Sequence, residues 1–258
     1  MVGACGDDSN AMVDAPPFVV EHDLTCLGNE PPSAVADALH LDSVLINATN
    51  FERIANGMVT VSSLDGTTQV ATATTNAEGE FALDLTNTAA LPRLRYAFEA
   101  TGFPNMRSYM NLPEWRSTST YRRRFFGFST SEAVNIATTL GTTLDPTKGA
   151  LQVWMTDCER GDFAGEMITI ADEPDAQWAH WSGNNVWVPR MTTIRPAVDR
   201  SESVAATVNL SPGLKTISVT AGGNTIGTTF YIEPDTITFL LLVPGFGDYP
   251  AVVDQEPI

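Results

Sequence analysis

The side chains that most often catalyse reactions or bind metals are few and scattered in this chain. Its 258 residues include three histidines, His22, His40 and His180, and none lies at metal-pair spacing from another. Zinc sites need Cys and His ligands at short, repeated spacings, and neither HExxH nor CxxC occurs. A GxSxG nucleophile motif and a glycine-rich phosphate loop are also absent. The sequence therefore predicts a protein that is not an enzyme and that holds no metal or cofactor, and the weaker alternative is an enzyme with an unrecognised active site.

Three tryptophans within ten residues form one candidate binding patch: Trp178, Trp181 and Trp187, with His180 among them. Aromatic rings at this density can form a platform for a sugar ring or a protein partner. Strand alternation would, however, place Trp178 and His180 on one face and Trp181 on the other. We therefore favour core packing and cross-strand pairing in a hairpin, and keep carbohydrate binding as the alternative function.

A second candidate patch is basic and aromatic. Arg122, Arg123 and Arg124 stand between Tyr121 and Phe125. Such a group could bind an acidic polymer. The alternative is pairing with the protein's own carboxylates, which are abundant in a chain of net charge −17.

The overall charge is strongly acidic, with 31 Asp and Glu against 14 Lys and Arg. An acidic surface repels nucleic acid and anionic lipid headgroups, so no nucleic-acid partner is predicted. Apolar residues make up 43% of the chain, which is enough to build folded cores and argues against general disorder.

The four residues Val2-Gly3-Ala4-Cys5 resemble the lipobox of bacterial lipoproteins, in which the cysteine is lipidated. The stretch from Gly6 to Phe18 is small, polar and Pro-containing, as a flexible tether should be. The basic and apolar leader of that family does not precede Cys5; either it is encoded upstream, or the four residues match the lipobox by chance. The resemblance implies a membrane anchor at Cys5 and an extracytoplasmic location. Gly6 in place of Asp favours the outer membrane within that family.

The other two cysteines, Cys26 and Cys158, predict one disulfide, because paired thiols in an exported chain are usually oxidised. The bridge would tie the N-terminal segment to the second half of the chain. The alternative is two buried free thiols.

The strongest structural signal is the stretch from Gly57 to Leu85, which predicts three short strands joined by two turns. Val59 and Val61 alternate with polar residues, and an Asp-Gly pair follows. Alternation with such punctuation is typical of β-hairpins. Further alternating stretches, such as Leu94–Ala100, continue this pattern.

The stretch Thr75-Asn76-Ala77-Glu78-Gly79-Glu80-Phe81, with the strands around it, resembles the carboxypeptidase regulatory-like domain. The resemblance covers about 80 residues and implies a transthyretin-like β-sandwich. The end of the chain, from Leu210 to Pro244, resembles the closing strands of the same sandwich. The resemblance therefore implies two tandem transthyretin-like or Ig-like β-sandwiches, and a mostly β fold.

The predicted organisation is a tether, two sandwiches, and a connecting region with one helix over Ser131–Leu140, capped by Thr130 or Ser131. The ranges are 1–33 for the lipobox and tether, 34–113 for the first sandwich, 114–147 for the linker, 148–245 for the second sandwich and 246–258 for a C-terminal tail. The predicted function is a cell-envelope binding or scaffold module, with a glycan or an envelope protein as partner.

Overall fold

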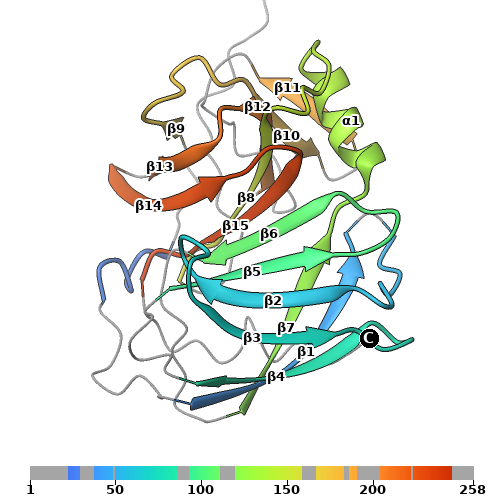
Figure 1. The fold of residues 1–258 in the computed structure, drawn as a ribbon. Coiled ribbons are helices and arrows are strands. Elements are labelled where there is room, and N and C mark those ends of the chain that lie inside the picture. Colours follow the sequence, from blue (N-terminus) through green and yellow to red (C-terminus); the bar gives the residue numbers. More distant parts are fainter. Residues whose placement is uncertain are drawn as a thin grey trace, which may run out of the picture.

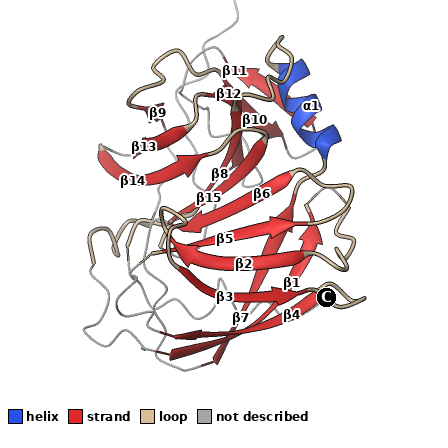
Figure 2. Cartoon of the chain, viewed as in Figure 1, coloured by secondary structure: helices blue, strands red, loops and turns tan. Residues whose placement is uncertain are grey.

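The computed structural model describes residues 23–29, 38–48, 50–86, 93–110, 120–158, 167–182, 186–190, 204–221 and 223–245. These residues form a mostly β structure with one short helix (Figure 2). The strands of the first half are β1 (Ala38–Asn47), β2 (Met58–Ser63), β3 (Gln69–Thr74), β4 (Glu80–Thr86), β5 (Leu94–Glu99), β6 (Asn105–Met110) and β7 (Thr120–Gly127). The second half contains α1 (Thr130–Thr139), β8 (Gly149–Met155), β9 (Met167–Ile170), β10 (Trp178–Ser182), β11 (Val186–Arg190), β12 (Val204–Leu210), β13 (Gly213–Ala221), β14 (Asn224–Ile232) and β15 (Thr236–Leu242).

One long sheet runs through both halves. Its nine strands have the order β11-β10-β12-β8-β15-β6-β5-β2-β3, and we call it the shared sheet (Figure 1). Strand β15 joins the halves, because it pairs in parallel with β8 on one side and with β6 on the other. Every residue of β15 is buried, as expected for a central strand that is covered on both faces.

The first half is a β-sandwich. A second sheet, with the order β4-β1-β7, packs on one face of the shared sheet. Leu41 and Leu45 of β1 meet Phe98 of β5 and Met106 of β6 in a common core. These residues alternate with more exposed or polar neighbours along their strands, so the core follows from the period of two.

Strand β7 lies within the range 114–147, which was expected to be a linker. It pairs in parallel with β1 along its whole length. Phe125 enters the core of the first half, where its ring centroid lies 4.7 Å from that of Tyr96 and 5.0 Å from that of Phe98. Three successive arginines interrupt the alternation of this strand, and for that reason its sequence did not predict a strand.

The second half covers both faces of the shared sheet. Met106 and Tyr109 of β6 point to opposite faces, because they are three residues apart in one strand. Met106 belongs to the core of the first half, whereas Tyr109 belongs to a core formed with the sheet β14-β13-β9. Helix α1 packs on the face that Met106 shares, through Ala133, Ile136 and Ala137. The two small sheets therefore lie on opposite faces of the shared sheet.

The three strands predicted between Gly57 and Leu85 are confirmed as β2, β3 and β4. Strands β2 and β3 form the expected antiparallel pair. Strand β4, however, leaves the shared sheet and pairs with β1 in the other layer. Its inward residues Phe81, Leu83 and Leu85 are buried as predicted, but alternation alone does not select the partner strand.

Helix α1 begins one residue earlier than predicted. Its N-cap is Ser129 rather than Thr130 or Ser131, and the Ser129 hydroxyl accepts a hydrogen bond from the Glu132 N–H at 3.3 Å. Gly141 follows the C-cap with a positive φ of 68°, a conformation that glycine adopts easily. In the described part of the chain, no helix has the length and apolar character needed to cross a membrane.

Candidate functional site

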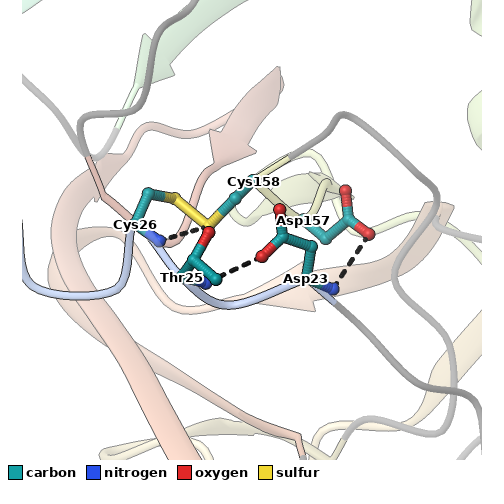
Figure 3. Close-up of a disulfide and its surroundings, with 5 residues drawn as sticks. All are labelled: Asp23, Thr25, Cys26, Asp157 and Cys158. Carbon is teal, nitrogen blue, oxygen red and sulfur yellow. Dashed lines mark hydrogen bonds between the residues drawn. A yellow bond between two sulfur atoms is a disulfide. The ribbon is translucent and has the colours of Figure 1, made fainter.

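Cys26 and Cys158 form a disulfide with their Cα atoms 5.7 Å apart, so the predicted bridge is confirmed (Figure 3). The backbone N–H of Cys26 donates to Cys158 Sγ at 2.9 Å, and two further backbone N–H groups join the two segments. That of Cys158 donates to the Asp23 carbonyl at 2.8 Å, and that of Asp23 donates to the Asp157 carboxylate at 3.4 Å. The bridge is therefore part of a wider contact between the N-terminal segment and the residues that follow β8.

The segment that carries Cys26 docks where two central strands of the shared sheet finish. Its partner cysteine follows β8, and Gly28 N–H donates to the carbonyl of Pro244, just after β15, at 3.5 Å. Leu24 and Leu27 pack against the core of the second half. We call this end of the shared sheet the disulfide end. The N-terminal segment is thus fixed to the second half, although it precedes the first half in sequence.

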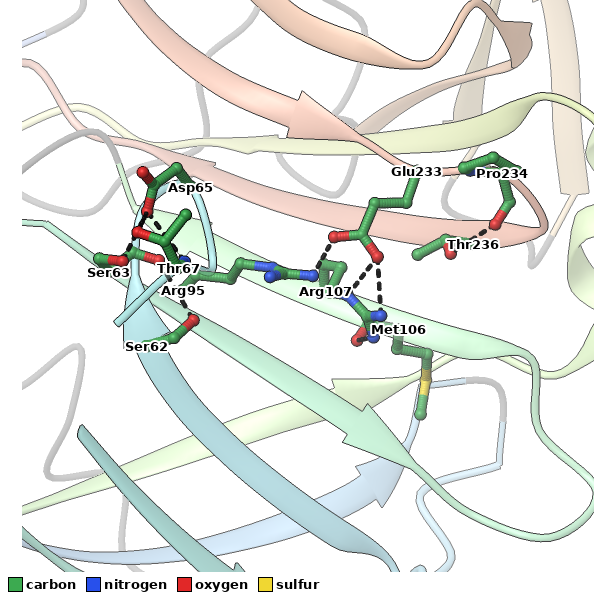
Figure 4. Close-up of polar contacts among 10 residues, drawn as sticks. All are labelled: Ser62, Ser63, Asp65, Thr67, Arg95, Met106, Arg107, Glu233, Pro234 and Thr236. Atoms are coloured by element: carbon green, nitrogen blue, oxygen red, sulfur yellow. Dashed lines mark hydrogen bonds and ion pairs between the residues drawn. The ribbon is translucent and has the colours of Figure 1, made fainter. Parts of the chain in front are cut away.

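Two arginines of the first half converge on one carboxylate of the second half (Figure 4). Glu233, between β14 and β15, accepts hydrogen bonds from Arg95 of β5 and from Arg107 of β6. The Nη2 and Nε atoms of Arg107 lie 2.8 and 3.0 Å from Oε2 of Glu233. The two arginine side chains are only 14% and 10% exposed, and that of Glu233 is 30% exposed. This largely desolvated triplet joins the two halves.

Arg93 extends the contact between the halves. Its Nη2 donates to the Thr229 carbonyl of β14 at 2.7 Å, and its Nε donates to the Met110 carbonyl at 3.0 Å. Strand β14 is the edge of its sheet, where backbone groups lack a neighbouring strand. The sequence contained no signal for these contacts, because each arginine and its partner on the β14 side are more than one hundred residues apart.

The three tryptophans of the first candidate patch do not share one exposed face. Trp178 is 1% exposed and lies in the core beneath β13. Trp187 is 7% exposed, and its Nε1 donates to the carboxylate of Glu132 in α1 at 2.5 Å. Trp181 is half-buried and packs edge-on against Trp187, with the ring centroids 5.2 Å apart. Only Trp181 therefore keeps part of its ring accessible to a ligand.

The remaining predicted site residues are distributed over distant places. Arg122, Arg123 and Arg124 lie in β7. Arg124 is half-buried, whereas the side chains of Arg122 and Arg123 lie outside the described part of the structure. Cys5 and His22 also lie outside the described residues.

The two histidines of the described part lie far apart in the fold. His180, on β10, is 2% exposed. His40, on the outer face of β1, contacts two carboxylates: its Nδ1 lies 2.6 Å from Asp84 Oδ1, and its Nε2 lies 3.2 Å from Asp42 Oδ1. No group of three or more His, Cys, Asp or Glu side chains that could hold a metal ion occurs among the described residues.

We expect His40 to titrate above the usual histidine value of 6.5, because its hydrogen bond to Asp84 raises the pKa. A raised folded-state pKa means that the contribution to stability is complete below the unfolded-state pKa and disappears as pH rises through the folded-state pKa. Titration of the His40 ring by NMR will measure this. Asp84→Asn should move the pKa back toward 6.5, and a wild-type pKa at or below that value would contradict the prediction.

Comparison with known proteins found distant structural likenesses. No family model and no curated protein matches the chain. The TIE protein of Bacillus anthracis is 12% identical with a TM-score of 0.27, over 80% of this chain and 33% of that one, so this chain spans about a third of its length. The shaft pilin of Lactobacillus rhamnosus GG is 11% identical with a TM-score of 0.22, over 83% of this chain and 99% of that one. The minor pilin of Streptococcus agalactiae is 12% identical with a TM-score of 0.23, over 83% and 98%. At such values the likeness extends to β-rich architecture and no further.

Proposed function

We propose that this protein is a non-enzymatic lipoprotein of the bacterial cell envelope that acts as a tethered binding or scaffold module. The observation that carries the proposal is the Cys26–Cys158 disulfide. Disulfides persist in oxidising, extracytoplasmic compartments and are rare in the bacterial cytosol. The bridge therefore supports an exported protein.

The position of the bridge supports the tether. A lipid on Cys5 would be followed by the short polar stretch before Phe18, and the chain would then be held at the disulfide end from Asp23 onward. Tension from an anchor would reach the second half through a covalent bond. The strand loops at the opposite end would face away from the membrane, where loops on a rigid frame can carry binding.

The finer parts of the proposal come from the sequence. They are an outer-membrane location, sandwiches of the carboxypeptidase regulatory-like type, and a glycan or an envelope protein as partner. Nucleic acid is not a proposed partner, because the chain has a net charge of −17.

The lipid anchor can be tested directly. The full gene with its upstream codons should yield protein that partitions into the detergent phase, and Cys5→Ala should shift it to the aqueous phase, because two acyl chains provide stable anchoring. Mass spectrometry of the N-terminal peptide should show the lipid on Cys5. Wild-type protein that is exported but stays in the aqueous phase would reject the lipoprotein proposal.

A further inference from the structure

The end of the shared sheet opposite the disulfide end contains the non-glycine residues of the described chain that have a left-handed backbone. We call it the loop end (right side of Figure 1). The non-glycine residues with positive φ in the described chain are Phe51, Asn56, Asn209 and Asp235. All of them lie at the loop end: Phe51 and Asn56 between β1 and β2, Asn209 near the end of β12, and Asp235 just before β15. Asn and Asp adopt this conformation readily, so only Phe51 is strained, and strained backbone concentrates at functional sites.

Phe51 is the most exposed large apolar residue of the described chain, with 67% of its surface accessible. Its φ of 58° is a conformation that bulky side chains rarely adopt. Three backbone hydrogen bonds hold this loop: Phe51 N–H to the Asn47 carbonyl at 2.8 Å, Asn47 N–H to the Glu52 carbonyl at 2.8 Å, and Ile54 N–H to the Leu45 carbonyl at 3.0 Å. These backbone hydrogen bonds close the loop that presents Phe51.

The loop that carries Phe51 is also fixed to the turn between β3 and β4. The Thr75 hydroxyl donates to the Ile54 carbonyl at 2.7 Å and accepts from the Gly57 N–H at 2.8 Å. Gly79 of this turn, with a φ of 71°, lies so close to Leu45 that an added Cβ would be 2.8 Å from the Leu45 carbonyl oxygen. A pre-organised loop loses little conformational entropy on binding, which favours an exposed aromatic residue as an anchor.

Acidic side chains predominate in the loops of the first half at this end. The loops of the first half at this end expose four carboxylates, Glu52, Glu78, Glu80 and Glu99, against the half-buried Arg53. An exposed aromatic ring beside carboxylates matches a partner surface with the opposite charge and an apolar pocket. A second copy of this chain, with its net charge of −17, does not fit this description, and neither does an anionic membrane.

We propose that the loop end of the first half is a docking surface for a protein partner with a cationic surface and an apolar pocket, into which Phe51 inserts. This inference rests on the proposed binding role but not on the lipid anchor. It differs from both sequence-predicted patches, because it uses neither the tryptophans around Trp181 nor the arginines of β7.

The probe is a set of short synthetic peptides: Lys/Leu amphipathic, Lys/Ser without apolar residues, and Glu/Leu with reversed charge. Binding to the full chain is measured by fluorescence anisotropy. We expect only the Lys/Leu peptide to bind. Phe51→Asn should weaken the affinity for this peptide at least about tenfold, as for an interface anchor. Glu78→Gln with Glu80→Gln should weaken binding and flatten its salt dependence.

The choice of Phe51→Asn separates binding from folding. Asn tolerates the left-handed backbone far better than Phe, so this variant should keep or raise the Tm while it loses the peptide. Leu214→Asn is the matched control, because Leu214 is 52% exposed on β13 of the second half, outside the proposed docking surface of the first half, and should leave peptide binding unchanged.

Several outcomes would overturn the inference. They are no binding of the Lys/Leu peptide, equal binding of the Lys/Ser peptide, or equal binding to Phe51→Asn and wild type. Self-association of the wild type that Phe51→Asn abolishes would indicate a second copy as the occupant instead. Binding that survives Phe51→Asn but is lost in a Trp181→Ala variant would preserve the general binding role and move the site. Loss of lipidation in Cys5→Ala, by contrast, concerns only the proposed anchor.

Discussion

Replacing Cys26 and Cys158 together by Ala should lower the free energy of unfolding by about 4–5 kcal/mol. The bridge joins residues 132 positions apart, and the chain-entropy model assigns this amount to a closed loop of that length because the loop restricts the unfolded chain. Every strand of the first half lies between the two cysteines, and so do α1 and β8 of the second half. Removal of the bridge therefore affects the unfolded ensembles of both halves.

Urea unfolding of the oxidised wild type and of the double Ala variant will measure this difference, and the Tm should fall by roughly 10–20 °C for a chain of this size. Ala is used rather than Ser because Cys26 is 4% exposed, and a hydroxyl there would be buried. The control is Cys5→Ala in the oxidised chain that keeps Cys26 and Cys158, and it should leave the free energy of unfolding unchanged. A loss below about 1 kcal/mol would show that the unfolded chain is already compact around the bridge.

Glu233→Gln should destabilise the protein by about 2–4 kcal/mol, because it removes the negative charge that pairs with two largely buried arginines. Gln keeps the shape and one acceptor oxygen but cannot neutralise Arg95 and Arg107. Both arginines belong to the first half and Glu233 belongs to the second, so the loss should also weaken the cooperativity between the halves.

Denaturant unfolding followed by tryptophan fluorescence and by far-UV circular dichroism will test both effects. Four of the five tryptophans lie in the second half, and Trp115 lies outside the described residues, so transitions that separate in a Trp115→Phe background would report uncoupling. Glu99→Gln, an exposed carboxylate on the same strand as Arg95, is the matched control and should change stability by less than about 0.5 kcal/mol. A Glu233→Gln variant as stable as that control would show that the arginines find adequate solvation without the carboxylate.

Local patterns in the sequence determined much of the secondary structure. Alternation predicted β2, β3 and β4, and the caps and apolar stripe predicted α1 to within one residue at its start. The disulfide could also be predicted, because once Cys5 is assigned to an anchor, Cys26 and Cys158 have no other partner. These inferences depend only on residue type and short spacing.

Partner choice was decided by the tertiary structure. The alternating residues of β4 show which face is buried, but its pairing with β1 instead of β3 depends on a strand more than thirty residues earlier. The hydrogen bond of Trp187 could likewise not be predicted, since its indole N–H donates to Glu132 of a helix that no local sequence pattern connects to Trp187. Contacts of this kind depend on packing at long sequence separation.

The sequence by itself therefore determined a β-rich chain, its acidic surface and its covalent bridge, because these follow from composition and local periodicity. Only the tertiary structure decided that one sheet passes through both halves, that Glu233 joins Arg95 to Arg107, and that Phe51 is exposed at the loop end. The physical reason is that strand pairing and side-chain convergence depend on which distant segments exclude water together, and alternation specifies a buried face without specifying what buries it.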